Sequence, residues 1–375
     1  MDPVKILKRS WHILWSYKAL WVFGLILALT AAGSSGGSGN SGSSYRYDGE
    51  NQQYELPLTE DFSEDFQKAF EEAGEEFKKI FEEGVQAAGI SRSEVSTLIW
   101  IGAAFILVML TMGIVMSIAR YVSETAVIRM VDEYEATDTK MTVRSGFRIG
   151  WSRTSWRLFL INLIVNIPVF LLIGLLIVDG FVVYRAVMSD GEQFAIAGMV
   201  ALIGFTFLII FVTILVMAVL MLLRQFFWRA AVLENLGVRE SLGSGFAMAR
   251  ENWKNIGLMW LIMMGLGIVW MIVSFISLFV LLPVAFFTAI FGAVIAAIPG
   301  MLLVGFFSLF LSGSLPWIVG GIFILPLFLT LAFSPWILLT AWQQIYASTV
   351  WTLTYREIKA LPALTEDSEI DLLEA

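Results

Sequence analysis

The chain has 375 residues, of which 58% are hydrophobic and only 15% are charged, whereas a soluble domain carries about 25% charged residues. It contains no cysteine, which excludes disulfide bonds and thiolate metal sites. Charged residues are absent from four long runs, residues 98–119, 158–178, 196–223 and 256–345. About 20 apolar residues cross a bilayer as a helix, and backbone groups in lipid must pair within the segment. We therefore expect an all-α, polytopic transmembrane helix bundle.

The first predicted unit, residues 1–32, is a basic surface helix followed by a span over about 13–32. Basic residues precede an apolar run from Ala19 to Ala32, an order that resembles a secretory signal peptide. The long, Trp-rich start differs from such a peptide, and the same pattern recurs twice later in the chain. We therefore expect this segment to remain as a true span.

The second unit, residues 33–95, is predicted to lie outside the cytoplasm. Gly33–Ser44 is a flexible Gly/Ser linker, and an acidic amphipathic helix is expected after it. Five phenylalanines of that helix share one stripe at helical spacing, namely Phe62, Phe66, Phe70, Phe77 and Phe81. We expect this stripe to pack on the outer ends of the spans or to lie on the membrane. The alternative is that it binds a partner protein.

Three segments of the chain open and close alike, which predicts three parallel repeats of an amphipathic surface helix plus a transmembrane hairpin. Each opening runs from a valine beside a basic residue to an aromatic–basic pair, over residues 4–18, 143–157 and 238–254. Each closing segment follows the returning span, over residues 120–127, 224–232 and 344–350. The shared order implies that all three hairpins cross the membrane in the same sense.

The apolar runs predict about six spans, at about 13–32, 96–119, 158–178, 195–223, 255–281 and 335–355. Residues 283–334 are also apolar, but Pro299-Gly300 and Pro326 divide them into short pieces. Such pieces favour a re-entrant or tilted pair, and two extra spans are the alternative, for a total of eight. Gly292 and Ala296 are small residues four apart, a spacing that lets helices approach closely.

Basic residues define the predicted orientation. The side that holds the three repeat openings carries 18 Lys and Arg, and the other side carries six, five of them within the acidic segment 33–95. By the positive-inside rule, we expect a multi-pass protein of the plasma membrane with both termini in the cytoplasm. Residues 96–359 form the predicted membrane bundle. Residues 360–375, with five acidic residues and no basic one, form an acidic cytoplasmic tail.

A collar of basic and aromatic residues is predicted at the inner membrane boundary. Its members are Lys18, Arg144, Arg148, Trp156, Arg157, Trp253 and Lys254. Trp prefers the interface, and each Lys or Arg near anionic lipid contributes about 1 kcal/mol. Ordinary positive-inside anchoring explains such a collar, and repeated sites for lipid headgroups are the sharper alternative. Membrane lipids are therefore the expected partners, with no nucleic acid and with an oligomeric state that the sequence does not define.

Chemistry-bearing residues are sparse. His12 is the only histidine and lies in the first surface helix, so neither a catalytic triad nor a metal cluster is expected. We expect no catalytic residue, no metal and no cofactor. Asn162 and Asn166 share one face of a predicted span. They predict hydrogen bonds between helices, with a polar path through the membrane as the alternative.

Some of these motifs resemble a known group of proteins. The motifs are Gly245-Phe246, the run Asn252–Asn255 (Asn-Trp-Lys-Asn), and the closing Leu353–Arg356 (Leu-Thr-Tyr-Arg). They resemble bacterial membrane proteins that include the membrane domain attached to some glycerophosphodiester phosphodiesterases. The resemblance covers most of the membrane body but not residues 33–95. It implies a helical membrane domain without the phosphodiesterase activity, because the acid- and histidine-rich catalytic domain has no counterpart here.

Three functions remain open from sequence. The first is a non-enzymatic membrane protein that binds anionic lipid or organises envelope lipid. The second is a transporter or channel-like protein for an apolar or lipidic substrate. The third is an adaptor that recruits a partner through the Phe-rich outer helix. The scarcity of charge within the spans argues against ion-coupled transport.

Overall fold

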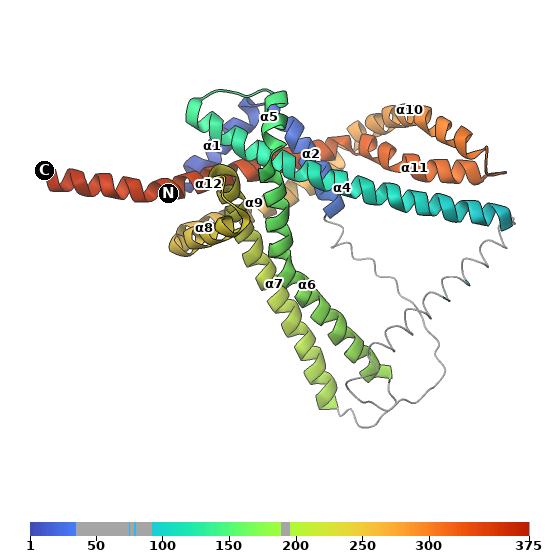
Figure 1. Cartoon of the computed structure of the whole chain (residues 1–375), viewed down its shortest axis with the longest axis horizontal. Helices are drawn as coiled ribbons and strands as arrows, with labels where there is room; N and C mark the ends of the chain where they lie inside the picture. Colours follow the sequence, from blue (N-terminus) through green and yellow to red (C-terminus); the bar gives the residue numbers. More distant parts are fainter. Residues whose placement is uncertain (35–74, 76–78, 80–91, 189–195, 375) are drawn as a thin grey trace.

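The computed structural model describes residues 1–34, 75, 79, 92–188 and 196–374, and its described residues form helices joined by short connections, without a strand (Figure 1). The helices are α1 (Pro3–Ser16), α2 (Ala19–Ser34), α4 (Arg92–Thr137), α5 (Val143–Gly150), α6 (Arg153–Met188), α7 (Ile196–Leu233), α8 (Val238–Glu251), α9 (Trp253–Val280), α10 (Leu282–Phe307), α11 (Leu315–Ala332) and α12 (Ser334–Glu374). The all-α, polytopic fold class is thus confirmed.

The helices form a hub with two arms. The hub gathers the short helices α1, α5 and α8 around the C-terminal part of α4, the end of α7 and the middle of α12 (Figure 1). One arm is the pair α6–α7. The other is the pair α10–α11, which meets the N-terminal half of α4 through a ring contact of 4.8 Å between Phe105 and Phe323. The hub therefore joins segments far apart in sequence, and the two arms contain most of the long apolar helices.

Six helices of the described chain are long and apolar enough to cross a membrane, and the bent pair α1–α2 makes a seventh if it counts as one span. The six are α4, α6, α7, α9, α10 and α11. The count of about six matches the expectation, but its members differ, because α10 and α11 are included, whereas α12 is not and α2 qualifies only together with α1. Among the described residues, six long apolar helices mark the chain as a multi-pass membrane protein.

The segment 282–332 corrects the expectation of short pieces. Pro299 lies inside one continuous helix, α10, and Pro326 lies inside α11. Proline is tolerated in membrane helices because neighbouring helices support the backbone, and here the pair is closely packed. A Cβ added at Gly292 would lie 2.9 Å from Leu331 Cβ, and Thr288 donates to the Ala332 carbonyl at 2.8 Å. Gly292 and Ala296 are both buried, as a close helix contact requires.

The first span also differs from its predicted limits. A bend of 100° separates α1 from α2, so residues 13–16 belong to the surface helix rather than to the span. Asp2 caps the start of α1 by accepting from the amides of Val4 and Lys5. At the bend, Tyr17 is buried and donates to the Met141 carbonyl at 3.0 Å, which holds the turn against the loop after α4.

Small residues let the short helices α1, α5 and α8 pack directly on the long helices α12, α4 and α7. A Cβ added at Gly150 in α5 would collide with the Val122 carbonyl of α4, and one at Gly245 in α8 would lie 2.7 Å from Phe227 Cδ1 of α7. In α1, Ser10 is fully buried, and Tyr346 of α12 donates to the Leu7 carbonyl. Each short helix thus packs on a different returning helix, α5 on α4, α8 on α7 and α1 on α12.

Candidate functional site

A polar cavity of about 100 Å³ lies where α4, α7 and α12 meet in the hub. Its polar lining consists of Arg120 and Glu124 from α4, Arg224 and Gln225 from α7, and Gln344 and Ser348 from α12. Leu27 of α2 and the indoles of Trp228 and Trp351 line it as well. The other described pockets are lined almost entirely by apolar surface, so this is the one among them that could hold a polar ligand.

A buried ion pair closes one side of the cavity. Arg229 is 1% exposed, and its guanidinium donates to the Ser348 carbonyl at 2.9 Å and to Gln225 Oε1 at 2.8 Å. The hydroxyl of Ser348 donates to Glu124 Oε1 at 2.8 Å, and Arg229 Nη2 lies 4.0 Å from the same oxygen. The pair joins three helices, and the added hydrogen bonds offset the desolvation of both charges.

Arg224 occupies the opposite side. Its Nη1 donates to Asn162 Oδ1 of α6 at 3.1 Å, and its guanidinium lies 5.0 Å from the centre of the Trp228 ring, within cation–π range. Asn162 is five residues beyond Arg157 along α6, which corresponds to about 7.5 Å of helix. The arginine therefore lies at most about one and a half turns deeper than the predicted collar.

The lining side chains occupy matching positions in the three closing segments. Arg120, Arg224 and Gln344 open the three segments. Glu124, Trp228 and Ser348 follow four residues later, on the same helix face. All six line the cavity. Equivalent faces of three similar segments thus converge on one point.

This cavity was not predicted from the sequence. Two predicted spans ended at residues 119 and 223, because Arg120 and Arg224 end the charge-free runs. In the structure α4 continues to Thr137 and α7 to Leu233. A charge ends an apolar run without ending a helix when other side chains pair with it. The available signal was the recurrence of a polar residue at the start of each closing segment.

Ion pairs fasten the hub at its rim. Arg9 of α1 donates to Glu135 of α4 at 2.7 Å, and Arg356 of α12 pairs with Asp132 of α4. Lys359 of α12 lies 2.8 Å from Glu234, just after α7. Partial burial raises the pKa of Glu234, but hydrogen bonds from Lys359 and Tyr355 lower it by more, so the net pKa lies below the usual glutamate value.

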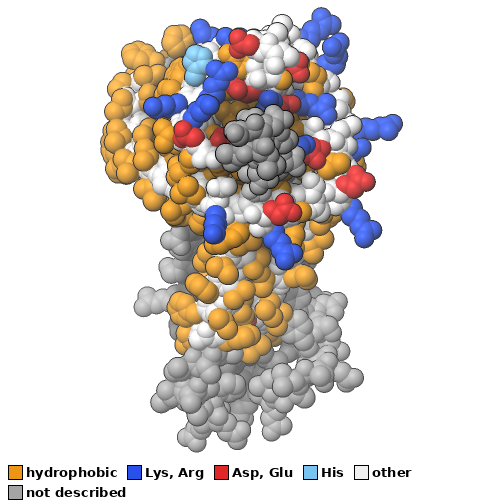
Figure 2. Space-filling view, turned by 90° about the vertical axis from the view of Figure 1, so that its left-hand side faces the viewer, with side chains coloured by type: hydrophobic (Ala, Val, Ile, Leu, Met, Phe, Trp, Pro, Cys, Tyr) orange, Lys and Arg blue, Asp and Glu red, His pale blue; other side chains and the backbone are white. Residues whose placement is uncertain are grey.

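The predicted collar residues lie around the hub, mostly exposed. Lys18, Arg144, Arg148 and Lys254 are all exposed, and Lys254 Nζ lies 5.9 Å from the centre of the Trp253 ring. Trp156 and Trp253 are 60% and 65% exposed. Trp151, which the sequence analysis did not single out, is 72% exposed on the same side as Trp156, and both line an apolar groove of about 450 Å³. Figure 2 shows Lys and Arg side chains around the hub and hydrophobic side chains below it.

Arg157 differs from the rest of the collar. It is half-buried, and its Nη1 donates to the carbonyls of Asn235 at 2.8 Å and Leu236 at 3.0 Å. Asn235 has a φ of 54°, in the left-handed region. Arg157 thus supports the tight turn between α7 and α8, which is a structural task within the protein.

The remaining predicted site residues divide into three groups. Asn162 bonds Arg224, whereas Asn166, one turn further along α6, is half-buried away from the cavity lining. The five phenylalanines Phe62, Phe66, Phe70, Phe77 and Phe81 lie outside the described residues. His12 is exposed on α1, and the described residues contain no group of three or more His, Asp or Glu side chains placed to hold a metal ion.

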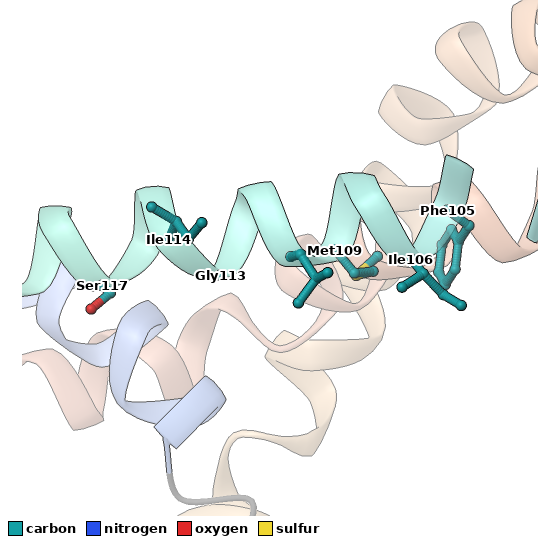
Figure 3. A pocket seen from close by; sticks show the side chains of 7 residues that line it. Phe105, Ile106, Met109, Gly113, Ile114 and Ser117 are labelled. Carbon is teal, nitrogen blue, oxygen red and sulfur yellow. The ribbon is translucent and has the colours of Figure 1, made fainter. Parts of the chain in front are cut away.

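A hollow along the N-terminal half of α4 contrasts with the polar cavity of the hub, because its lining is apolar. Figure 3 shows Phe105, Met109, Gly113 and Ser117 along one face of this helix. All the residues that line the hollow come from α4, and nearly all its surface is apolar. A concavity on one helix without convergent polar groups lacks the features of a specific ligand site.

Comparison with known proteins gives one match. No curated protein and no solved structure matches the chain. The chain does match a family of unknown function, DUF7544, over residues 8–360. This match spans the hub, both arms and the segment between α2 and α4, so the protein belongs to the DUF7544 family.

Proposed function

We propose that the protein is a non-enzymatic integral membrane protein that binds anionic phospholipid at the inner boundary of the plasma membrane. The observation that carries the proposal is the exposed collar. Four cationic side chains, Lys18, Arg144, Arg148 and Lys254, are exposed, as are the indoles of Trp156 and Trp253, and Lys254 lies over the Trp253 ring. Indoles occupy the headgroup level, and cations at that level attract anionic headgroups.

The arrangement of the short helices supports the proposal. α1, α5 and α8 each precede a long apolar helix, and each packs through small residues on a returning helix. In our interpretation these are three parallel repeats, which present three similar basic–aromatic corners to one leaflet. That orientation places both termini in the cytoplasm, where anionic lipid is concentrated. The resemblance to membrane domains attached to glycerophosphodiester phosphodiesterases fits a lipid-directed role without catalysis.

The test compares two variants that remove the same charge. The collar variant changes Lys18, Arg144, Arg148 and Lys254 to Gln. The control changes Lys5, Lys8, Arg239 and Arg250, which are also exposed on α1 and α8, to Gln. Each protein is placed in nanodiscs of mixed phosphatidylglycerol and phosphatidylcholine, and the lipids retained on release are identified by native mass spectrometry. We expect the collar variant to lose retained phosphatidylglycerol and the control to keep it. Equal loss in both variants would reduce the collar to generic anchoring.

A second candidate is a transporter for an apolar or lipidic substrate. The observation that favours it is the Asn162–Arg224 contact inside two candidate spans, because polar groups at such positions often line transport paths. Reconstituted vesicles with a fluorescent phospholipid in one leaflet would show accelerated exchange if this role were correct. The adaptor role depends on the Phe-rich helix and stays a prediction, tested by deleting residues 57–84 and comparing co-purified proteins.

A further inference from the structure

We propose that the cavity between α4, α7 and α12 is a binding site for one phosphate-type oxyanion. The side chains at the junction include three arginines, Arg120, Arg224 and Arg229, against one carboxylate, Glu124. The carboxylate already accepts from Ser348 and faces Arg229. The local charge is therefore positive, which excludes a cation as the ligand and favours an anion.

Donors without partners provide an independent observation. Trp228 is 5% exposed and lines the cavity, yet its indole Nε1 has no hydrogen-bond partner. The Nε atom of Arg224, which also lines the cavity, is likewise buried without a partner. A buried donor that is left unpaired is unfavourable, more so when it is charged. Two such donors in one cationic lining indicate that an acceptor-rich ligand belongs there.

The chemistry of the lining defines the ligand class. Guanidinium groups match the oxygens of phosphate through paired hydrogen bonds, and the amides of Gln225 and Gln344 supply further donors. A volume of about 100 Å³ admits several water-sized groups. One tetrahedral oxyanion fits this space, and a nucleotide does not.

Two sources could supply that oxyanion. Arg224, which lines the cavity, contacts Asn162 of α6, about 7.5 Å of helix beyond Arg157, so the phosphate of an inner-leaflet lipid is close in depth. Free phosphate could arrive from the cytoplasmic side of the hub. The site is separate from the collar residues, so its occupancy can fail while the collar still binds lipid, and the reverse also holds.

The experiment follows the thermal unfolding of purified, delipidated full-length protein in a neutral detergent. Inorganic phosphate is titrated against chloride at equal ionic strength, and short-chain phosphatidylglycerol against short-chain phosphatidylcholine. A ligand that binds the folded state raises Tm with its concentration. A rise with phosphate identifies a free-oxyanion site, and a rise with phosphatidylglycerol alone identifies a lipid headgroup. No rise in either titration would overturn the proposal.

Variants assign any rise to the cavity. We expect Trp228→Phe, which keeps a ring but removes the unpaired N–H, to weaken the apparent affinity by about tenfold, the effect of losing one hydrogen bond to a charged partner. Arg224→Gln should weaken it by at least about tenfold as well. The collar variant should retain the rise with phosphate. If Trp228→Phe instead leaves the affinity unchanged, and the collar variant abolishes the rise, the anion binds at the collar and the cavity proposal is wrong.

Discussion

The hub and the arms are stabilised by different interactions. In the hub, α4, α7 and α12 bring together a buried ion pair, a polar cavity and a cluster of fully buried side chains such as Phe23, Ile13 and Phe226. In the arms, large side chains such as Phe211 of α7 and Phe291 of α10 are 63% and 67% exposed. Lipid is as apolar as these side chains, so their exposure costs little. Specific side-chain contacts therefore concentrate in the hub, and the arms mainly need length and hydrophobicity.

The largest effect should come from breaking the buried pair. Arg229→Met removes the buried cation that faces Glu124 and the donor to the Ser348 carbonyl, and breaking a buried pair typically costs about 3–5 kcal/mol. We expect a loss toward the lower end of that range in the free energy of unfolding, measured by denaturation with SDS in mixed micelles, because Arg120 and Arg224 also lie near Glu124. Adding Glu124→Gln to Arg229→Met should restore part of it, because neither partner of this pair is then charged. A single variant as stable as the wild type would show that this pair does not stabilise the hub.

A smaller loss of stability should follow from filling the close contact between α8 and α7. Gly245→Ala places a Cβ 2.7 Å from Phe227 Cδ1, so α8 must shift on α7, at a cost of about 1–3 kcal/mol. Gly257→Ala is the matched control in α9, where an added Cβ meets nothing within 4 Å. There alanine should be neutral or stabilise the helix by up to about 1 kcal/mol. Similar losses in both variants would contradict a specific α7–α8 contact.

These contrasts explain how far the sequence could predict the structure. The arms were predictable, because long charge-free runs in lipid have no stable alternative to helices. The hub was not, because Arg120 and Arg224 gave the same local signal as ordinary boundary residues. Only the convergence of α4, α7 and α12 brings them together in one cavity. The continuity of α10 through Pro299 also depends on a neighbour, α11, that the local sequence does not specify. The collar stays a prediction as a boundary feature, and the role of Arg157 in the α7–α8 turn was not predicted.

Replacing either of the two predicted intramembrane asparagines should lower the free energy of unfolding by a modest amount, and the two losses should differ. Asn162 accepts from Arg224 Nη1 at 3.1 Å, and such contacts in membrane proteins contribute about 0.6 kcal/mol on average. Asn162→Ala should therefore destabilise the protein by about that much. Asn166→Ala, one turn away, should have a smaller effect. A double-mutant cycle of Asn162→Ala with Arg224→Gln measures the coupling free energy of the two side chains directly. A coupling of zero would show that this contact does not stabilise the hub.

The smallest effect concerns pH at the rim. The pKa of Glu234 is lower in the folded protein, so its pairing with Lys359 and Tyr355 stabilises the fold fully above the unfolded pKa of about 4.3. That contribution is lost as pH falls through the lowered folded pKa. Glu234→Gln should therefore remove less than about 1 kcal/mol near neutral pH, because the pair is partly exposed, and should reduce the loss of stability at acidic pH. Lys359→Gln should flatten the same range. If both variants keep the wild-type pH dependence, acid sensitivity arises elsewhere, and the rim pair at Glu234 contributes only to the position of α12 beside α7.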